Sequence, residues 1–254
     1  MIYAVKSAIK LLQKHEPKQG YFGCFSGGKD SIVIKKLAEM ANVKVIWHYH
    51  KTTIDPPELV QFIKREHPEV IFDRPKHGNF FNRMVEVGFP TRLNRWCCRE
   101  YKEGKFPIDA TILMGIRAEE SVNRSQRWGR VSLHWKTDNV IINPIYNWDS
   151  EEIWDFIKNE KVPYCSLYDE NFGRLGCIGC PMARTIGRKK AFERWPQYEK
   201  KWRKAFQKIW EKRSGKLDRN GRIWFGNRYF HNWQELYTWW LSDKKLPKPI
   251  NKGF

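Results

Sequence analysis

The sequence lacks any apolar run near the about 20 residues that a membrane-spanning helix requires. It also lacks a cleavage-type signal, because its first residues, MIYAVKSAIKLLQKHE, have the amphipathic pattern of a helix and not that of a targeting peptide. No internal repeat or low-complexity tract occurs, which excludes solenoid and fibrous architectures. We therefore expect a cytoplasmic protein without membrane association. Its 254 residues suffice for one large domain, or for one domain with an appendage.

Acidic residues are scarce in this chain. It has 28 Asp and Glu against 47 Lys and Arg, which gives a formal net charge of +19. Such a charge favours polyanionic ligands, namely nucleic acid, nucleotides or acidic membranes. The alternative is an ordinary basic protein whose lysines are simply solvated. The surplus is uneven, because residues 184–254 hold 20 basic and only 6 acidic side chains.

Strand and helix patterns alternate over the first two-thirds of the chain. Short apolar runs predict strands at 21–25, 43–49, 70–72, 111–116 and 140–142. Between them, a helix is expected over 29–40, and capping patterns predict further helices that begin with Asp55 and Asp149 as N-caps. This alternation predicts an α/β fold with a parallel five-stranded sheet, helices on both faces, and ligands at the carboxyl ends of the strands.

The composition changes after about residue 183, so we expect one domain over 1–183 and a basic, aromatic-rich helical extension over 184–254. One helical stripe is formed by Trp195, Tyr198, Trp202, Phe206 and Ile209. Core packing is the first interpretation of these aromatics, and base stacking by one or two exposed rings stays open. A second helix is expected to open at Asn232. The polar sides of these helices supply candidates for phosphate contact, which are Arg188, Lys189, Lys190, Lys201 and Lys204.

Residues 26–31 read SGGKDS and follow a buried strand directly. Glycines let backbone N–H groups point inward, and the following helix adds the positive end of its dipole. Lys29 adds a charge, while Asp30 cannot favour bare phosphate and would bind Mg²⁺ or orient the loop. The candidates for phosphate binding here are Ser26, Gly27, Gly28, Lys29, Asp30 and Ser31.

The string SGGKDS resembles the PP-loop of the ATP pyrophosphatases, and further motifs resemble the phosphoadenosine phosphosulfate (PAPS) reductase branch of that superfamily. These motifs are TTIDPPE at 52–58, GIRAEES at 115–121 with Arg124, PI at 144–145 before Trp148, PY at 163–164, LY at 167–168 and GCIGCP at 176–181. The resemblance implies an adenine-nucleotide alpha-hydrolase-like (Rossmann-like) sheet that binds ATP and Mg²⁺. It implies Lys29, Asp30 and Arg117 as catalytic residues. Further nucleotide contacts are implied at Gly115, Glu120, Ser121 and Arg124.

Six cysteines in a reducing compartment favour metal or redox ligands over disulfides. Adjacent cysteines followed far downstream by C-x-x-C resemble the [4Fe–4S] ligands of adenylylsulfate (APS) reductases, which implies a cluster on Cys97, Cys98, Cys177 and Cys180 with Lys102 close by. A four-cysteine zinc site and the absence of metal are the alternatives. Cys24 is expected in the core, and Cys165 is either a core residue or a sulfur carrier.

Two features depart from the sulfonucleotide reductases. No cysteine follows Cys180, although those enzymes use a C-terminal nucleophilic thiol, and the second strand ends in WHYH without the customary acidic residue. The preferred hypothesis is therefore an ATP pyrophosphatase that activates DNA or tRNA for sulfur incorporation, as in DNA phosphorothioation or tRNA thiolation. Its sulfur would come from a donor such as a cysteine desulfurase. An APS/PAPS reductase and a non-catalytic nucleotide- and nucleic-acid-binding module are the alternatives, and a homo-oligomer stays open.

Overall fold

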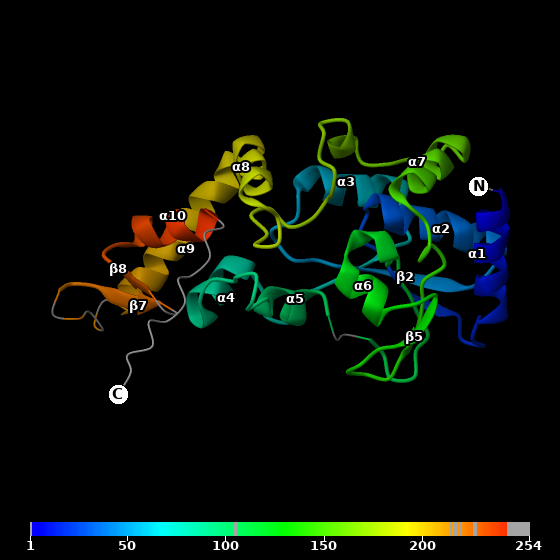
Figure 1. Cartoon of the computed structure of the whole chain (residues 1–254), viewed down its shortest axis with the longest axis horizontal. Helices are drawn as coiled ribbons and strands as arrows, with labels where there is room; N and C mark the ends of the chain where they lie inside the picture. The colour runs from blue at the N-terminus through cyan, green and yellow to red at the C-terminus, as the bar shows by residue number, and fades with distance from the viewer. Residues whose placement is uncertain are drawn as a thin grey trace. The chain divides into compact units, whose positions relative to one another are not determined.

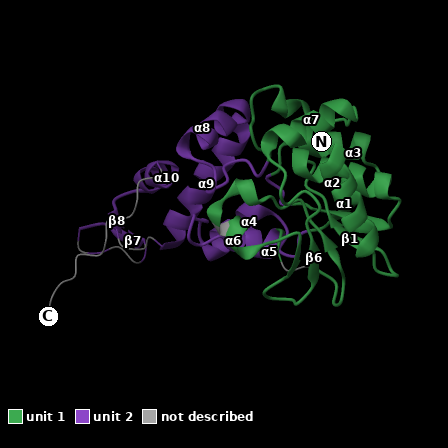
Figure 2. Ribbon diagram, turned by 45° about the vertical axis from the view of Figure 1, so that its right-hand side comes forward, with its two compact units in different colours: residues 1–51, 55–74, 102–175 green, residues 52–54, 75–101, 176–254 purple. Residues whose placement is uncertain are grey.

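The computed structural model describes residues 2–103, 106–213, 215, 218, 220–225 and 228–242. The chain forms two compact units that alternate along the sequence (Figure 2). Unit 1 comprises Met1–Lys51, Asp55–Arg74 and Lys102–Leu175, and unit 2 comprises Thr52–Ile54, Pro75–Tyr101 and Gly176–Phe254. The domain boundary expected near residue 183 stays a prediction. The end of the expected extension, residues 243–254, lies outside the described residues.

A six-stranded sheet organises unit 1, with the strand order β3-β2-β1-β4-β6-β5. Its strands are β1 (Tyr21–Cys24), β2 (Val45–His50), β3 (Ile71–Asp73), β4 (Ile112–Leu113), β5 (Val131–Leu133) and β6 (Val140–Ile142). All neighbours pair in parallel except β5, which is antiparallel to β6. The α/β fold is therefore confirmed, but the expected count of five strands is wrong. The edge strand β5 escaped prediction because Val131 and Leu133 are exposed and give no buried apolar run.

The helices of unit 1 are α1 (Ile2–Lys14), α2 (Lys29–Ala41), α3 (Pro57–Glu66), α6 (Val122–Arg127) and α7 (Ser150–Asn159), with the 3-10 turns η1 (Ala118–Glu120) and η2 (Ser166–Tyr168). Helices α2, α3 and α7 lie along the same side of the sheet (Figure 1). The Asp149 cap is confirmed, because its carboxylate accepts from the Glu152 N–H at 2.8 Å. The Asp55 cap is wrong, since Pro56 takes the cap position. A residue before proline favours extended backbone, so the helix starts only at Pro57.

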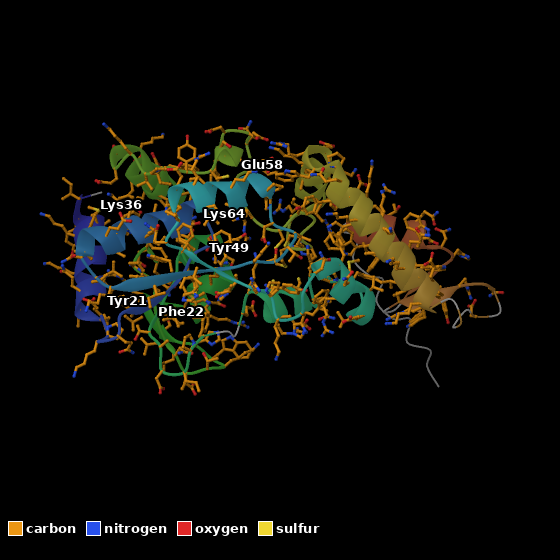
Figure 3. The ribbon with its side chains drawn as sticks, turned by 180° about the vertical axis from the view of Figure 1, so that it is seen from behind. Tyr21, Phe22, Lys36, Tyr49, Glu58 and Lys64 are labelled. Atoms are coloured by element: carbon orange, nitrogen blue, oxygen red, sulfur yellow. The ribbon has the colours of Figure 1, made fainter. Side chains whose placement is uncertain are left out.

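Side chains of β1 and β2 alternate between a buried and a more open face of the sheet. Tyr21 and Tyr49 are buried, and the Tyr21 hydroxyl donates to the Leu12 carbonyl of α1 at 2.7 Å. Phe22 lies on the opposite face, where its ring stacks on His48 with centroids 4.1 Å apart. Figure 3 labels Tyr21, Phe22 and Tyr49 on these strands. The carboxyl ends of β1 and β2 thus carry polar groups on a half-buried surface.

Unit 2 is built around aromatic side chains. It contains α4 (Phe80–Val87), α5 (Trp96–Tyr101), α8 (Thr185–Arg194), α9 (Pro196–Arg213), α10 (Trp233–Leu241) and a hairpin of β7 (Ile223–Phe225) and β8 (Arg228–Phe230). The stripe on α9 packs into this core: Trp202 is fully buried and stacks on Trp240 with centroids 4.6 Å apart. The Asn232 cap of α10 is confirmed by its 2.8 Å bond from the Glu235 N–H. No helix in the described ranges is long and apolar enough to cross a membrane.

Arg188 does not face solvent, contrary to expectation. Its side chain is 2% exposed, and its guanidinium donates to the carbonyls of Trp240 at 2.9 Å and Leu241 at 3.2 Å. The group also lies over the Trp240 ring, 5.1 Å from its centroid. A guanidinium that satisfies the last carbonyls of a helix stabilises the helix end. Arg188 therefore fastens α8 to the carboxyl end of α10, a tertiary role that helical periodicity alone cannot reveal.

Gly23 tests how tightly β1 and β2 pack. A Cβ atom at this position would lie 2.3 Å from the Trp47 ring and 2.7 Å from a Val45 methyl group. Gly23→Ala is expected to lower the free energy of unfolding by about 1–3 kcal/mol, the usual cost of overpacking. Urea denaturation would measure it. Gly173→Ala is the matched control, because a Cβ there meets nothing within 4 Å. Equal stability of the two variants would contradict this account of the sheet.

Candidate functional site

The SGGKDS loop connects β1 to α2 at the carboxyl edge of the sheet in unit 1. Gly27 has a φ of +71°, a left-handed conformation that side-chain-bearing residues rarely adopt, and a Cβ there would approach Leu59 and Ile63 of α3 to 2.8 Å. Gly28 is the N-cap of α2, and its carbonyl accepts from the Ser31 hydroxyl at 2.8 Å. Glycine at both positions therefore lets the chain turn directly from strand into helix. The amino end of a 13-residue helix meets this corner.

The hydrogen-bond donors of the loop are already organised. The Ser26 hydroxyl accepts from the Gly28 N–H at 3.3 Å and lies 3.2 Å from the Ser31 hydroxyl. The Lys29 N–H donates to the Tyr168 hydroxyl at 2.8 Å. Burial raises the pKa of Tyr168 well above its ordinary value, so the phenol stays neutral. Sequence reasoning quoted Tyr168 only as part of a motif, and nothing local in the sequence indicates this contact across 139 residues.

Arg117 fixes the carboxylate of Asp30. Its Nε donates to Asp30 Oδ1 at 2.7 Å, and the Lys29 ammonium lies 3.1 Å from the same oxygen. The Arg117 side chain is almost fully buried. Its remaining donors reach the Glu119 carboxylate, the Trp148 carbonyl and the Ser150 hydroxyl. In this arrangement Arg117 positions Asp30, and its direct contact with a nucleotide stays a prediction.

The other predicted nucleotide contacts have local structural partners. Gly115 passes close to the backbone of Asp30, where a Cβ would come within 3.3 Å of it. Ser121 caps α6 by accepting from the Arg124 N–H at 3.2 Å, and the Arg124 side chain forms an ion pair with Glu120. The structure thus brings Gly115 to the loop, while the nucleotide roles of Glu120, Ser121 and Arg124 stay predictions.

The carboxyl end of β2 has no acidic residue of its own, but Asp73 of β3 brings a carboxylate next to it. Asp73 lies against both histidines of the WHYH segment: its Oδ2 is 3.2 Å from His48 Nδ1 and 2.9 Å from His50 Nδ1. Cys24 belongs to the same edge, because it is the register partner of His48 in the β1–β2 pair. Burial and the charge of Asp73 raise the pKa of the Cys24 thiol to about 12. Sequence reasoning missed Asp73, since its approach to β2 depends on strand register.

The four predicted cluster ligands all belong to unit 2. Cys97 and Cys98 lie on α5, and the C-x-x-C turn is closed by the Cys180 N–H, which donates to the Cys177 carbonyl at 3.1 Å. This turn is held by the Trp202 indole N–H, which donates to the Ile178 carbonyl at 3.1 Å.

The donor set fits a thiophilic metal or an iron–sulfur core. A hydrogen bond with Cys98, burial, and the charges of the other three cysteines raise the pKa of Cys97 above its ordinary value. A positive metal centre would compensate this cost of forming thiolates. Within the described ranges, however, no three His, Cys, Asp or Glu side chains are spaced as a set of metal ligands. The four-cysteine cluster therefore stays a prediction, as does the role of Lys102, which is exposed and belongs to unit 1.

The basic side chains of the predicted phosphate-tracking surface differ in exposure. Lys189 on α8, and Lys201 and Lys204 on α9, are exposed, whereas Lys190 is half-buried. Only the exposed members are free to contact a polyanion without rearrangement of the core. Arg188 does not belong to this surface, because it is buried.

Comparison with known proteins places this geometry in context. A sequence model of the phosphoadenosine phosphosulfate reductase domain matches residues 21–183. An uncharacterised protein of Methanocaldococcus jannaschii is 30% identical over 205 residues, which cover 74% of this chain and 42% of that protein. An adenosine 5'-phosphosulfate reductase of Staphylococcus haemolyticus is 27% identical over 213 residues, 78% of this chain and 86% of that enzyme. The chain spans about half the length of the first curated relatives that it matches.

Among solved structures, a PAPS reductase from Candida auris in complex with phosphate is similar in fold, with a TM-score of 0.51 at 16% identity over 67% of this chain and 88% of that chain. The PP-loop corner, the parallel sheet and the family match agree. The chain belongs to the phosphoadenosine phosphosulfate reductase family.

Proposed function

We propose that this protein is a PP-loop ATP pyrophosphatase that activates a nucleic acid for sulfur incorporation. The observation that carries the proposal is the SGGKDS corner, where Lys29 and Arg117 hold Asp30 beside the amino end of α2. A helix amino end, a lysine and converging hydroxyls stabilise the charge of a leaving pyrophosphate. Asp30 supplies an oxygen ligand suited to Mg²⁺.

The proposed reaction has two displacements. An oxygen of the nucleic acid attacks the α-phosphorus of ATP, the bond to the bridging α–β oxygen breaks, and pyrophosphate leaves into the loop. A sulfur nucleophile from a donor such as a cysteine desulfurase then displaces AMP from the activated nucleic acid. Cys97, Cys98, Cys177 and Cys180 would hold an iron–sulfur cluster, which would bind the incoming sulfur. The exposed lysines of α8 and α9 favour a polyanionic substrate.

A sulfonucleotide reductase is the second candidate, because the matched relatives include APS reductases. That reaction needs a thiolate that attacks the substrate's sulfur. Cys165 is 1% exposed, and burial raises its pKa above the ordinary value. Cys24 has its pKa raised to about 12. Neither thiol is a good nucleophile at neutral pH, which favours the first candidate.

Turnover of labelled ATP with and without DNA or tRNA distinguishes the candidates. The proposed enzyme releases AMP and pyrophosphate faster when its nucleic acid is present. A reductase instead produces sulfite from APS or PAPS in the presence of a thiol. A binding module shows affinity for ATP and nucleic acid without turnover. Sulfite production at enzymatic rates, with no effect of nucleic acid on ATP, would overturn the proposal.

The loop is tested by Lys29→Ala and Asp30→Ala. Both variants should lose pyrophosphate release by at least about 100-fold, the usual scale for removing one electrostatic contact to a developing charge. Lys36→Ala is the matched control, because Lys36 lies on the same helix and forms a surface ion pair with Glu39 at 3.8 Å. Cooperative thermal unfolding of each variant would show that the fold persists. Full activity in both loop variants would show that SGGKDS is a structural turn without a role in catalysis.

The cluster is tested by anaerobic purification. The protein should be brown, contain iron and sulfide in a cubane ratio of about 1:1, and bleach in air. Cys97→Ser and Cys180→Ser should remove the colour, whereas Cys165→Ser, in the other compact unit, should keep it. Iron analysis and absorption spectra provide the measurement. A colourless anaerobic preparation with one bound zinc would contradict this prediction.

The basic surface is tested through salt dependence. Charge reversal of Lys189, Lys201 or Lys204 should flatten the log–log dependence of nucleic-acid affinity on salt by about one phosphate contact at most. Affinity for free ATP should not change. Lys18→Glu is the control, since Lys18 is equally exposed but belongs to unit 1. If all three variants match this control, the surface does not track a backbone. Fluorescence anisotropy over a salt series measures the slopes.

A further inference from the structure

The hairpin of unit 2 presents two aromatic rings to solvent. Trp224 on β7 and Tyr229 on β8 lie directly opposite each other in the antiparallel pair, with ring centroids 4.6 Å apart and planes inclined by 65°. Their exposed fractions are 49% and 42%. The neighbouring Phe225 and Phe230 point to the other face and are buried, where they pack on aromatic rings of α9 and α10. The hairpin is therefore anchored by one face and offers an aromatic pair on the other.

Arg222 and a local surplus of basic residues accompany this aromatic pair. The Arg222 guanidinium lies over the Tyr229 ring, 4.4 Å from its centroid, and is oriented by an ion pair with Asp218 at 2.8 Å. Arg228 begins the second strand but lies on the anchored face, opposite Phe225, with its guanidinium 5.5 Å from the Phe230 ring centroid. Over residues 212–228 the sequence has six basic side chains and one acidic side chain. Exposed aromatics in an ordinary surface are scattered singly, so a paired set within such a charge surplus indicates a ligand that is both flat and anionic.

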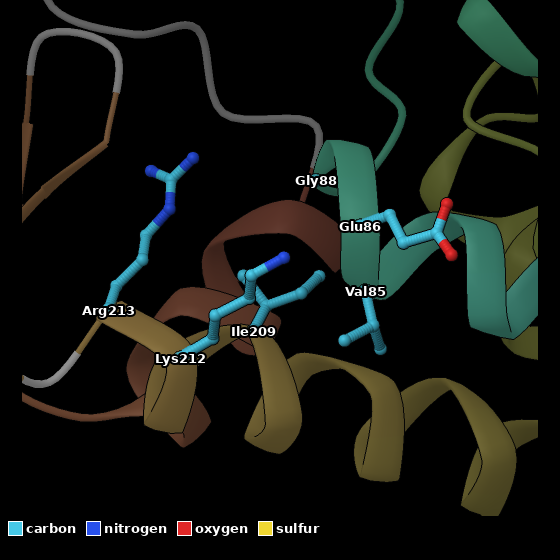
Figure 4. A pocket seen from close by; sticks show the side chains of 6 residues that line it. All are labelled: Val85, Glu86, Gly88, Ile209, Lys212 and Arg213. Atoms are coloured by element: carbon cyan, nitrogen blue, oxygen red, sulfur yellow. The ribbon is translucent and has the colours of Figure 1, made fainter.

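The end of α9 carries further positive charge behind the hairpin. Lys212 and Arg213, with residues of α4, line a cavity of about 190 Å³. In Figure 4 these two cations project from α9, while the Glu86 carboxylate turns to the opposite side. The Arg213 guanidinium also lies over the Phe225 ring, 4.5 Å from its centroid. The end of α9 thus adds positive charge at the anchored face of β7, opposite the face that presents Trp224.

We propose that Trp224 and Tyr229 form a stacking platform for an unpaired base of the nucleic-acid substrate, with a phosphate on Arg222. The inference deepens the proposed function and rests on it, since it assumes a nucleic acid as substrate. Aromatic side chains on a strand surface stack on bases of any sequence, and neighbouring arginines hold the backbone. A second copy of the chain is a poor occupant, because it would bring like charge against like charge.

The test separates stacking from charge. A labelled single strand of about 12 nucleotides and an abasic strand of the same length carry the same phosphates, but only the first offers bases. Trp224→Ala should weaken binding of the base-bearing strand about 5- to 100-fold and leave the abasic strand unchanged. The salt slope should not change, because no phosphate contact is lost. Trp224→Phe should retain most of the affinity, which shows that a ring suffices.

Trp135→Ala is the matched control. Trp135 is 71% exposed and has the Lys136 ammonium 4.4 Å from its ring centroid, but it belongs to unit 1. This variant should bind both strands like the unaltered protein. Equal weakening of both strands by Trp224→Ala, or no weakening at all, would overturn the platform. So would a shift in oligomeric state without a change in strand affinity, since the pair would then be an interface between copies.

The test of the stacking platform and the test of the proposed ATP chemistry can fail separately. If ATP turnover does not respond to nucleic acid but Trp224→Ala still discriminates the two strands, the proposed function fails and the platform stands. If turnover responds to nucleic acid while Trp224→Ala behaves like Trp135→Ala, the platform fails alone. Cooperative thermal unfolding of every variant, compared with that of the unaltered protein, excludes loss of fold as the cause.

Discussion

The buried ion pair between Arg117 and Asp30 holds the candidate site of unit 1 together. Arg117 follows β4, Asp30 opens α2 after β1, and the same guanidinium reaches Trp148 and Ser150 at the start of α7. One side chain thus connects segments that follow three different strands. Because Arg117 is almost fully buried, loss of Asp30 would leave the guanidinium in a poorly solvated place with Glu119 as its remaining carboxylate partner among the described residues, which would destabilise this corner. The shape of the loop therefore depends on this pair as much as on its glycines.

The two compact units divide the chemistry between them. Unit 1 contains the SGGKDS loop with Lys29 and Asp30. Unit 2 contains the four cysteines of the predicted cluster, the exposed lysines of α8 and α9, and the aromatic hairpin. A reaction that uses a nucleotide, a sulfur species and a polyanion needs all of these groups. The family match ends at residue 183, so the helices and hairpin beyond it are where this chain can differ most from the reductases it resembles.

Apart from the Asp55 cap, which the following proline displaces, local patterns predicted what local physics determines. The Asn232 and Asp149 caps, the buried stripe of α9 and the SGGKDS corner each depend on residues within about two helical turns, and all four agree with the structure where it tests them. Contacts between distant segments escaped prediction. Arg188 was expected to face solvent, because its bond to the carboxyl end of α10 cannot be read from the sequence of α8. Asp73 meets its histidine partners through the register of β2 and β3. The edge strand β5 was missed because its apolar side chains are exposed.

The hydrogen bond between the Lys29 N–H and the Tyr168 hydroxyl has a consequence for the proposed release of pyrophosphate. Without a ligand, the first donor of α2 is not an unsatisfied buried group, since the phenol already accepts from it. An anion that binds this N–H must displace the Tyr168 hydroxyl. One acceptor then replaces another, and the N–H does not gain a hydrogen bond that it lacked before. Exchange of hydrogen-bond partners yields a smaller net free energy than the satisfaction of an unpaired buried group. In the proposed reaction, the loop would therefore bind its anion with moderate strength, and the Tyr168 hydroxyl would replace the anion as it leaves.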